Sequence, residues 1–176
     1  DYESRESLTM PEYLEMIRLK TSVLLGGALQ LGAILSGADE KQQQLIYDFG
    51  ENVGLEFQLQ DDILDAYGDP DTFGKIVGGD IMINKKTFLL VKLMEVISEE
   101  DTPLMQKLLE SSIDTLPSKV EDMLALYRKY EVKFAADKLK YVYTQQAFKK
   151  MEALYVPNEH TTALLVLANN LLVRHQ

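Results

Sequence analysis

Apolar side chains recur every three or four residues along almost the whole chain. They fall at Tyr13, Met16 and Ile17 near the start, and the same spacing returns in 85–97 and again in 159–173. This spacing builds one apolar face of an α-helix. No pair of alternating segments is joined by the short Gly- or Asn-rich turn that is typical of a β-hairpin. The pattern therefore predicts an all-α fold of six to eight helices.

Short polar signals mark where the first long helical pattern begins and ends. Thr9 and Glu12 have the spacing of a capping box, in which each side chain accepts a backbone N–H of the other residue. The apolar pattern that follows contains Gly26–Gly27, which we expect to bend the helix. Gly37 is typical of a helix C-terminus, because glycine readily adopts a left-handed conformation.

A second long helical pattern covers residues 40–67. Asp39 is placed to cap it, and Ser118 to Glu121 has the spacing of a further capping box later in the chain. Gly50 and Gly54 lie inside the 40–67 pattern, where each costs about 1 kcal/mol of helix stability relative to alanine. Their presence indicates either the close approach of another helix or space for a substrate.

Four polar side chains form a narrow stripe near the end of this pattern. Because a helix turns about 100° per residue, Gln58, Asp62 and Asp65 all lie within about 100° of Asp61. Apolar residues flank the stripe on both sides, so these carboxylates repel one another and are hard to solvate fully. A bound hard cation such as Mg²⁺ would relieve this conflict. A solvated acidic helix face explains the same four residues equally well.

The residues after the stripe favour the first interpretation. A Gly- and Pro-rich loop, 68–79, carries Lys75, and the segment Asn84-Lys85-Lys86-Thr87 then begins the next helical pattern. Carboxylates followed by lysines on loops are suited to a metal-bound polyphosphate. An acidic chain that binds phosphates needs cations to reverse the local sign of charge.

Composition narrows the possible functions further. The 176 residues suffice for a single all-helical domain, 1–176, and no apolar run is long enough to span a membrane. The formal net charge of -10 argues against nucleic acid as a partner. The chain has no cysteine, which fits a cytoplasmic protein without disulfides. It begins at Asp1 rather than at methionine, which suggests a fragment or a processed product.

The run FQLQDDILD, followed by GDP, FGK, GGDI and NKKT, resembles the second aspartate-rich region of the trans-prenyltransferases, the polyprenyl synthetases. The match in order and spacing extends over about thirty positions and is highly specific. It implies the isoprenoid-synthase type of helical bundle, of which this chain would be the C-terminal portion. It also implies a homodimer, and a reaction that condenses an allylic diphosphate with isopentenyl diphosphate in isoprenoid biosynthesis.

The resemblance assigns roles to individual residues. Carboxylates would bind Mg²⁺, or Mn²⁺ as a substitute: Asp61, Asp62 and Asp65. Lysines would contact the diphosphate: Lys20, Lys75 and Lys85. Catalytic roles at the reacting carbon and its leaving group would fall to Lys20, Thr21, Gln58 and Lys75.

The chain departs from the family pattern in one respect. Family members carry two aspartate-rich motifs, and only the second is found here, so we expect the first motif and the isopentenyl diphosphate site to precede Asp1. The isolated chain is then expected to have little or no turnover. The form of the motif favours a short-chain synthase. Alternatives are a terpene cyclase on the same scaffold, a non-catalytic subunit of a prenyl synthase, and a helical interaction module.

Overall fold

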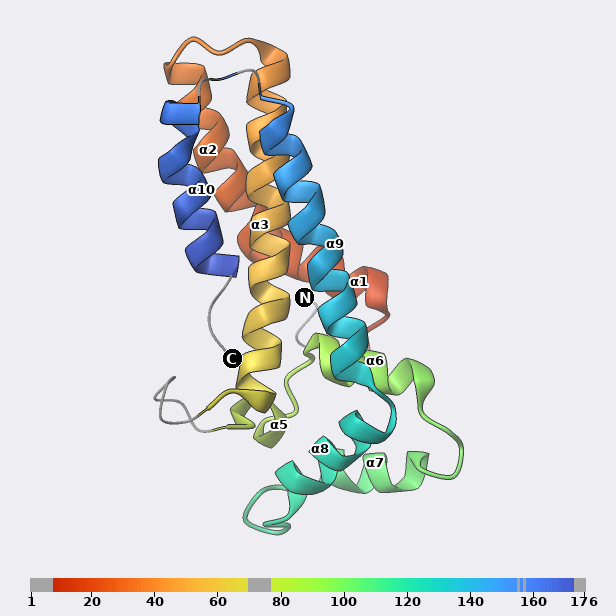
Figure 1. Ribbon diagram of the computed structural model, residues 1–176. Helices are drawn as coiled ribbons and strands as arrows, with labels where there is room; N and C mark the ends of the chain where they lie inside the picture. The colour runs from red at the N-terminus through yellow and green to blue at the C-terminus, as the bar shows by residue number, and fades with distance from the viewer. Residues whose placement is uncertain (1–7, 70–76, 155, 157, 173–176) are drawn as a thin grey trace. The chain divides into compact units, whose positions relative to one another are not determined.

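The computed structural model describes residues 8–69, 77–154, 156 and 158–172, and none of these residues lies in a β-strand. The prediction of an all-α fold is confirmed (Figure 1). The chain divides into two compact units, one formed by residues 1–13 and 61–137 and the other by residues 14–60 and 138–175. We call them unit 1 and unit 2 and describe each separately. That residues 1–176 form a single domain stays a prediction.

Unit 2 is a bundle of long helices that run side by side (Figure 1). Its helices are α2 (Val23–Leu35), most of α3 (Glu40–Tyr67), most of α9 (Val132–Glu152) and α10 (Asn158–Leu172). Side chains from α3, α9 and α10 form its buried core: Ile46, Phe49, Val53, Ala147, Met151 and Ala168. The core therefore joins segments that are more than a hundred residues apart in the sequence.

The first helical stretch begins where predicted, and a short segment of different helical geometry interrupts it. Helix α1 (Met10–Ile17) is preceded by Thr9, whose backbone N–H donates to Glu12 Oε2 at 2.9 Å, as a capping box requires. A π-helical segment, η1 (Arg18–Ser22), interrupts the α-helix before α2 begins. Helix α2 runs through Gly26–Gly27 without a break, so the bend expected there stays a prediction. Gly37, with φ of 78°, ends this stretch as predicted.

Helices α2 and α3 approach each other closely at their glycines. A Cβ added to Gly54 would lie 2.7 Å from the Cα of Ser22, and one added to Gly50 would lie 2.9 Å from the Cα of Gly26. No side chain larger than hydrogen fits at these distances, so close helix approach accounts for both glycines. The cap of α3 is also confirmed, since Asp39 Oδ1 accepts the N–H of Gln42 at 2.8 Å.

Unit 1 contains shorter helices: α5 (Gly79–Met82), α6 (Phe88–Val96), α7 (Thr102–Glu110) and α8 (Lys119–Lys129). The last turns of α3 and the first of α9 also belong to it. Tyr13 and Phe88 are buried in its core and meet edge to face, with ring centroids 6.1 Å apart. The capping box expected at Ser118 is wrong, because this residue is helical and its hydroxyl donates to Asp122 instead.

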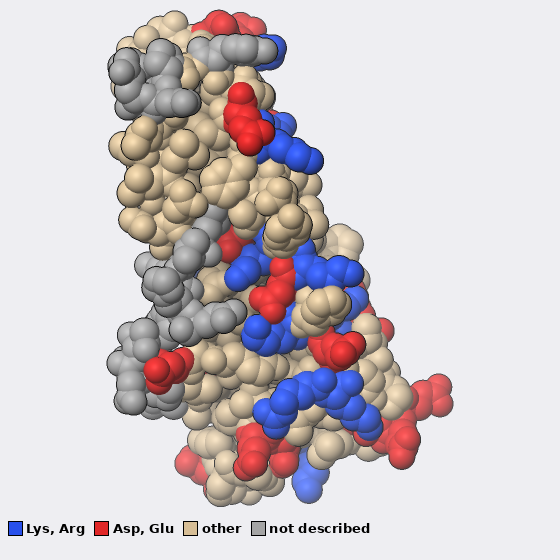
Figure 2. Space-filling view, in the orientation of Figure 1, with Lys and Arg blue, Asp and Glu red and all other residues tan. Residues whose placement is uncertain are grey.

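The surface differs between neighbouring helices of unit 2. Charged side chains gather along α9, whereas the face over α10 is largely free of them (Figure 2). Several α9 lysines pair with acids, such as Lys150 with Asp48 at 2.7 Å. Within the described residues, no helix combines the length and the apolar character needed to cross a membrane.

Candidate active site: carboxylates and a lysine in unit 1, a pocket in unit 2

Asp62, near the end of α3, is held from two sides. Its Oδ2 accepts the hydroxyl of Tyr13 at 2.6 Å and the backbone N–H of Phe88 at 2.7 Å, and only 7% of the residue is exposed. Burial raises the pKa of this carboxyl to about 6, against the lowering effect of these hydrogen bonds and of Lys85. Asp62 therefore ties α3 to the start of α1 and the start of α6.

Asp65, one turn further along α3, fixes the segment that begins at Val77. Its Oδ2 accepts the backbone N–H of Asp80 at 2.8 Å, and its backbone carbonyl accepts that of Gly78 at 2.6 Å. Burial is the main cause that raises the pKa of the Asp65 carboxyl. A Cβ at Gly79 would lie 3.3 Å from Asp65 Oδ1, so a small residue suits this approach. Asp80 is thereby brought next to the acids of α3.

Lys85 is a cation that these acids share. Its Nζ lies 2.6 Å from Asp80 Oδ2 and 3.9 Å from Asp62 Oδ1. Burial lowers the pKa of Lys85, but the hydrogen bond that its ammonium donates to Asp80 and the neighbouring negative charges outweigh this effect, so the pKa is raised. Asp61 is partly buried and contributes to that charge. Lys85 thus stays protonated and balances part of the local negative charge.

The donor set suits a hard cation. Within the described residues, no three carboxylates converge closely enough to bind one ion by themselves. Mg²⁺, however, commonly uses one or two carboxylates and completes its shell with water and phosphate oxygens. Asp61 and Asp65 lie one helical turn apart on α3. Asp62 Oδ2 already accepts two hydrogen bonds and Asp65 Oδ2 accepts one, so water and phosphate oxygens would complete the shell of an ion bound to Asp61 and Asp65.

Lys20 and Thr21 lie in unit 2, where the π-helical segment η1 carries both. They form one end of a pocket of about 450 Å³ whose other walls are almost wholly apolar. The lining residues come from α2, α3 and α10: Leu24, Leu25, Ala28, Val53, Gly54, Phe57 and Leu171. A single π turn shifts the register of the side chains that follow it and is frequent at functional sites. The pocket combines an ammonium and a hydroxyl with space for an apolar ligand.

The predicted site residues are thus distributed over both units. Asp62, Asp65 and Lys85 come together in unit 1, and Lys20 and Thr21 share the pocket of unit 2. Gln58 is partly buried on α3, one turn before Asp61 and Asp62. Lys75 lies outside the described residues.

Two residues of the unit 1 site had no assigned role in the sequence. Asp80 belongs to the GGDI run, but the sequence does not predict its position beside Asp65. Tyr13 was recognised only as part of an apolar face, although its hydroxyl binds Asp62 across 49 positions of sequence. The GGDI run is a usable signal for Asp80. The spacing of residues gives no signal for Tyr13.

A family model for polyprenyl synthetases matches residues 1–129 of this chain. A short chain isoprenyl diphosphate synthase of Methanothermobacter thermautotrophicus is 32% identical over 173 residues, which is 98% of this chain and 52% of the relative. A geranylgeranyl diphosphate synthase of Sulfolobus acidocaldarius is 34% identical over 77% of this chain and 41% of its own length. This chain therefore spans about half the length of these relatives.

Solved structures show the same arrangement. The crystal structure of a geranylgeranyl pyrophosphate synthase is 42% identical, with a TM-score of 0.88 over all of this chain and 55% of its own. The geranylgeranyl pyrophosphate synthetase of Pyrococcus horikoshii is 28% identical, with a TM-score of 0.86 over 97% of this chain and 51% of its own. The expected type of helical bundle is confirmed.

Proposed function

Because this chain belongs to the polyprenyl synthetase family, we propose that it supplies part of the active site of a prenyl diphosphate synthase. The reaction would condense an allylic diphosphate with isopentenyl diphosphate. The observation that carries the proposal is the group of acids around Lys85, in which Asp65 Oδ2 accepts the backbone N–H of Asp80 at 2.8 Å. Such a group suits a leaving group that is itself a polyphosphate anion bound through metal ions.

The acids and lysines would stabilise the departing pyrophosphate. Asp61 and Asp65 would hold Mg²⁺, or Mn²⁺ in its place, and a bound divalent ion neutralises charge that develops on the phosphate oxygens. Lys85 lies beside the acids and would donate to the diphosphate once their charge is shared with the metal. Preorganised cations aimed at developing negative charge commonly supply a large part of catalysis. Lys75 is assigned the same role by resemblance.

The pocket in unit 2 would receive an allylic chain. Its walls are almost wholly apolar, as an allylic chain requires, and Lys20 and Thr21 add an ammonium and a hydroxyl to the lining. From Lys20 to Ala28 the pocket extends about 12 Å along the helix axis, at about 1.5 Å per residue. Gln58 and Thr21 would face the developing cation. Short-chain synthases among the relatives support a short product.

A thermal unfolding experiment tests the proposal. The unfolding midpoint is measured for this chain with Mg²⁺ and inorganic pyrophosphate together, with Mg²⁺ alone and with neither. A ligand at a hundred times its dissociation constant adds about 2.7 kcal/mol to the free energy of unfolding. We expect a rise that needs both ligands and is lost in Asp61→Asn.

Glu95→Gln is the matched control, because Glu95 pairs with Lys92 on the surface of α6. Its midpoint is expected to rise as in the parent chain. A polypeptide extended by the first aspartate-rich motif is tested in parallel, since we propose that the 176-residue chain alone turns over little or nothing. The absence of a ligand-dependent rise in the extended polypeptide would overturn the proposal.

A role as one component of a two-chain synthase is a second candidate. One relative is named heptaprenyl diphosphate synthase component 2, from Bacillus subtilis, and is 33% identical over 81% of this chain. The family resemblance alone instead predicts a homodimer, and the absence of cysteine fits a location in the cytoplasm. Copurification of tagged chain from its own source distinguishes the two, because a second component would appear at a fixed ratio and would be required for turnover.

A further inference from the structure

Lys119, the first residue of α8, is completely buried in unit 1. Its Nζ donates to Asn84 Oδ1 at 2.8 Å and to the backbone carbonyls of Ser111 at 2.7 Å and Met82 at 3.3 Å. A lysine is rarely buried completely unless an acid pairs with it. Here these three acceptors are neutral, and burial lowers the pKa of the ammonium.

The side-chain acceptor of Lys119, Asn84, adopts an uncommon backbone conformation. Its φ is 55°, in the left-handed region, which strains asparagine less than most residues other than glycine. Both ends of its side-chain amide are engaged, since Oδ1 accepts from Lys119 and Nδ2 donates to the carbonyl of Leu109 at 2.7 Å. Strain of this kind persists only where the surroundings hold it.

This turn places the next residue, Lys85. The backbone N–H of Lys85 donates to the carbonyl of Asp80 at 2.9 Å, and its Nζ reaches the Asp80 carboxylate at 2.6 Å. The residue after Lys119 also contacts the start of this segment, because a Cβ at Gly78 would lie 2.5 Å from Val120 Cγ1. The first turn of α8 therefore contacts both ends of the segment 78–84, at Gly78 and at Asn84.

We propose that Lys119 is a positioning residue for the diphosphate site: through Asn84 it fixes the left-handed turn that directs Lys85 toward Asp80 and Asp62. An ammonium has three donors, and three acceptors surround this one, so an apolar side chain of the same length cannot replace it. The effect on diphosphate binding rests on the proposed function. The positioning of Lys85 rests only on the geometry of unit 1.

The test compares Lys119→Met with Met123→Ala in the full-length polypeptide that carries this sequence. Met123 is buried one turn further along α8, so its truncation destabilises the same helix without removing either side-chain hydrogen bond of Asn84. Two quantities are measured for each variant. One is the affinity for inorganic pyrophosphate with Mg²⁺, by titration calorimetry, and the other is amide hydrogen exchange in residues 78–88.

Lys119→Met is expected to weaken the affinity at least tenfold and to speed exchange in 78–88, whereas Met123→Ala leaves the affinity within twofold and that exchange unchanged. Asn84→Gly serves if Lys119→Met does not fold, because glycine adopts the left-handed turn without its side-chain contacts. It is expected to weaken the affinity about threefold and to speed exchange in the same segment.

Equal affinity and equal exchange in Lys119→Met and Met123→Ala would overturn the inference, as would unchanged affinity and exchange in Asn84→Gly. If the parent polypeptide binds no pyrophosphate, the proposed function fails and exchange alone decides the positioning. Faster exchange only in the Lys119 and Asn84 variants would then still support it.

Discussion

Helix α3 carries two buried carboxyl groups, six residues apart, in very different surroundings. Asp62, in unit 1, accepts hydrogen bonds from a tyrosine hydroxyl and a backbone N–H. Glu56, in unit 2, is 1% exposed, and neither of its oxygens has a hydrogen-bond partner. Burial raises the pKa of both, to about 6 for Asp62 and about 7 for Glu56.

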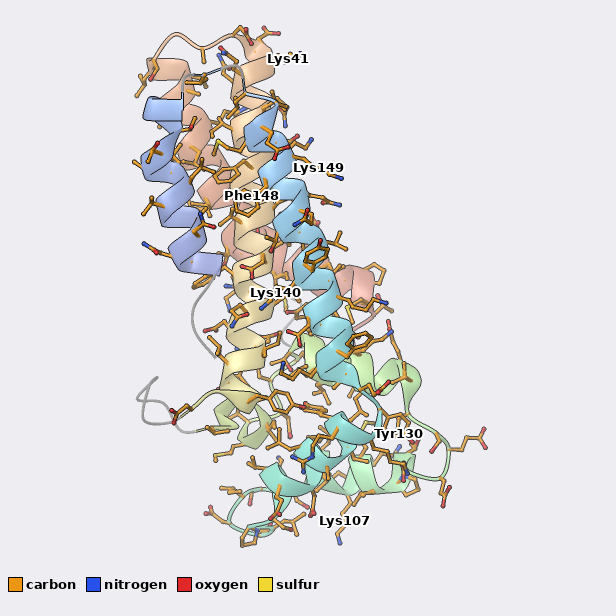
Figure 3. All side chains as sticks on the ribbon, viewed as in Figure 1. Lys41, Lys107, Tyr130, Lys140, Phe148 and Lys149 are labelled. Atoms are coloured by element: carbon orange, nitrogen blue, oxygen red, sulfur yellow. The ribbon has the colours of Figure 1, made fainter. Side chains whose placement is uncertain are left out.

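The comparison separates two consequences of burial. Where donors are already in place, a buried carboxylate can keep its charge near neutral pH and remain ready for a cationic partner. Where they are absent, the charge is costly and the group tends to hold a proton. Lys140 lies on α9 and donates to Gln60 Oε1 at 2.5 Å (Figure 3). Its positive charge offsets only part of the rise in the pKa of Glu56 that burial causes.

The largest expected effect comes from removing charge in unit 1. Asp61→Asn is expected to lower prenyl transfer by the full-length polypeptide at least about a hundredfold, as is common when one preorganised group at a reacting centre is lost. Glu56→Gln, on the same helix, is expected to leave the rate within about twofold. Pyrophosphate release at saturating Mg²⁺ measures both. Comparable losses in the two variants would show that the acids of α3 do not differ in function.

Glu56 is expected to make stability depend on pH. Its pKa is raised from 4.5 to about 7 in the folded chain, so the folded state binds more protons than the unfolded state between these values. Stability therefore falls as the pH rises through this window and levels off above it. The loss is up to about 3 kcal/mol, at about 1.4 kcal/mol per pKa unit.

Glu56→Gln removes this dependence. Its free energy of unfolding, from urea titrations at pH 4.5 and pH 8, is expected to exceed that of the parent chain at pH 8 and to approach it at pH 4.5. Asp48→Asn is the control, because the carboxylate of Asp48 pairs with Lys150 and accepts a hydrogen bond from the Gln44 amide. An equal pH slope in parent and Glu56→Gln would show that Glu56 ionises freely in the fold.

Tyr13→Phe tests the opposite case, in which the partner is present. It removes one donor to Asp62 without changing the packing of the ring against Phe88. A buried hydrogen bond to a charged group contributes about 1.5–3 kcal/mol, so the free energy of unfolding is expected to fall by about 2 kcal/mol. Urea unfolding measures it, with Tyr141→Phe, at an exposed tyrosine, as the control. Equal values for the two variants would contradict the role of the hydroxyl.

The parts of the fold that depend on neighbouring residues were predictable from the sequence. The cap at Asp39, the stop at Gly37 and the close approach at Gly50 and Gly54 follow from local rules about donors, left-handed turns and the absence of a Cβ. The motif around Asp61 also predicts which acids bind the metal, and that assignment stays a prediction. These features require only a few residues of context.

Other parts depend on contacts that spacing does not reveal. The hydroxyl of Tyr13 and the carboxylate of Asp62 meet only after the chain folds, and the same holds for Lys119 and Asn84. The π-helical turn at Arg18–Ser22 has no local signal either. Ser118 satisfied the capping rule, yet its hydroxyl donates to Asp122. A local rule states what a side chain can do, and tertiary contacts decide among the options.

The smallest expected effect lies at Ser22, whose buried hydroxyl has no hydrogen-bond partner. Alanine at this position removes a desolvated polar group and raises helix propensity, against the loss of contact with Gly54. We expect Ser22→Ala to raise the free energy of unfolding by about 0.5–1 kcal/mol. Thr87→Ala, at the buried cap of α6, removes an acceptor of the Leu90 N–H and is expected to lower it by about 1 kcal/mol. Urea unfolding measures both free energies. Changes of opposite sign would show that uncharged side chains follow the same contrast between groups with and without a hydrogen-bond partner. A lower free energy of unfolding in both variants would instead indicate that the Ser22 hydroxyl binds a water molecule.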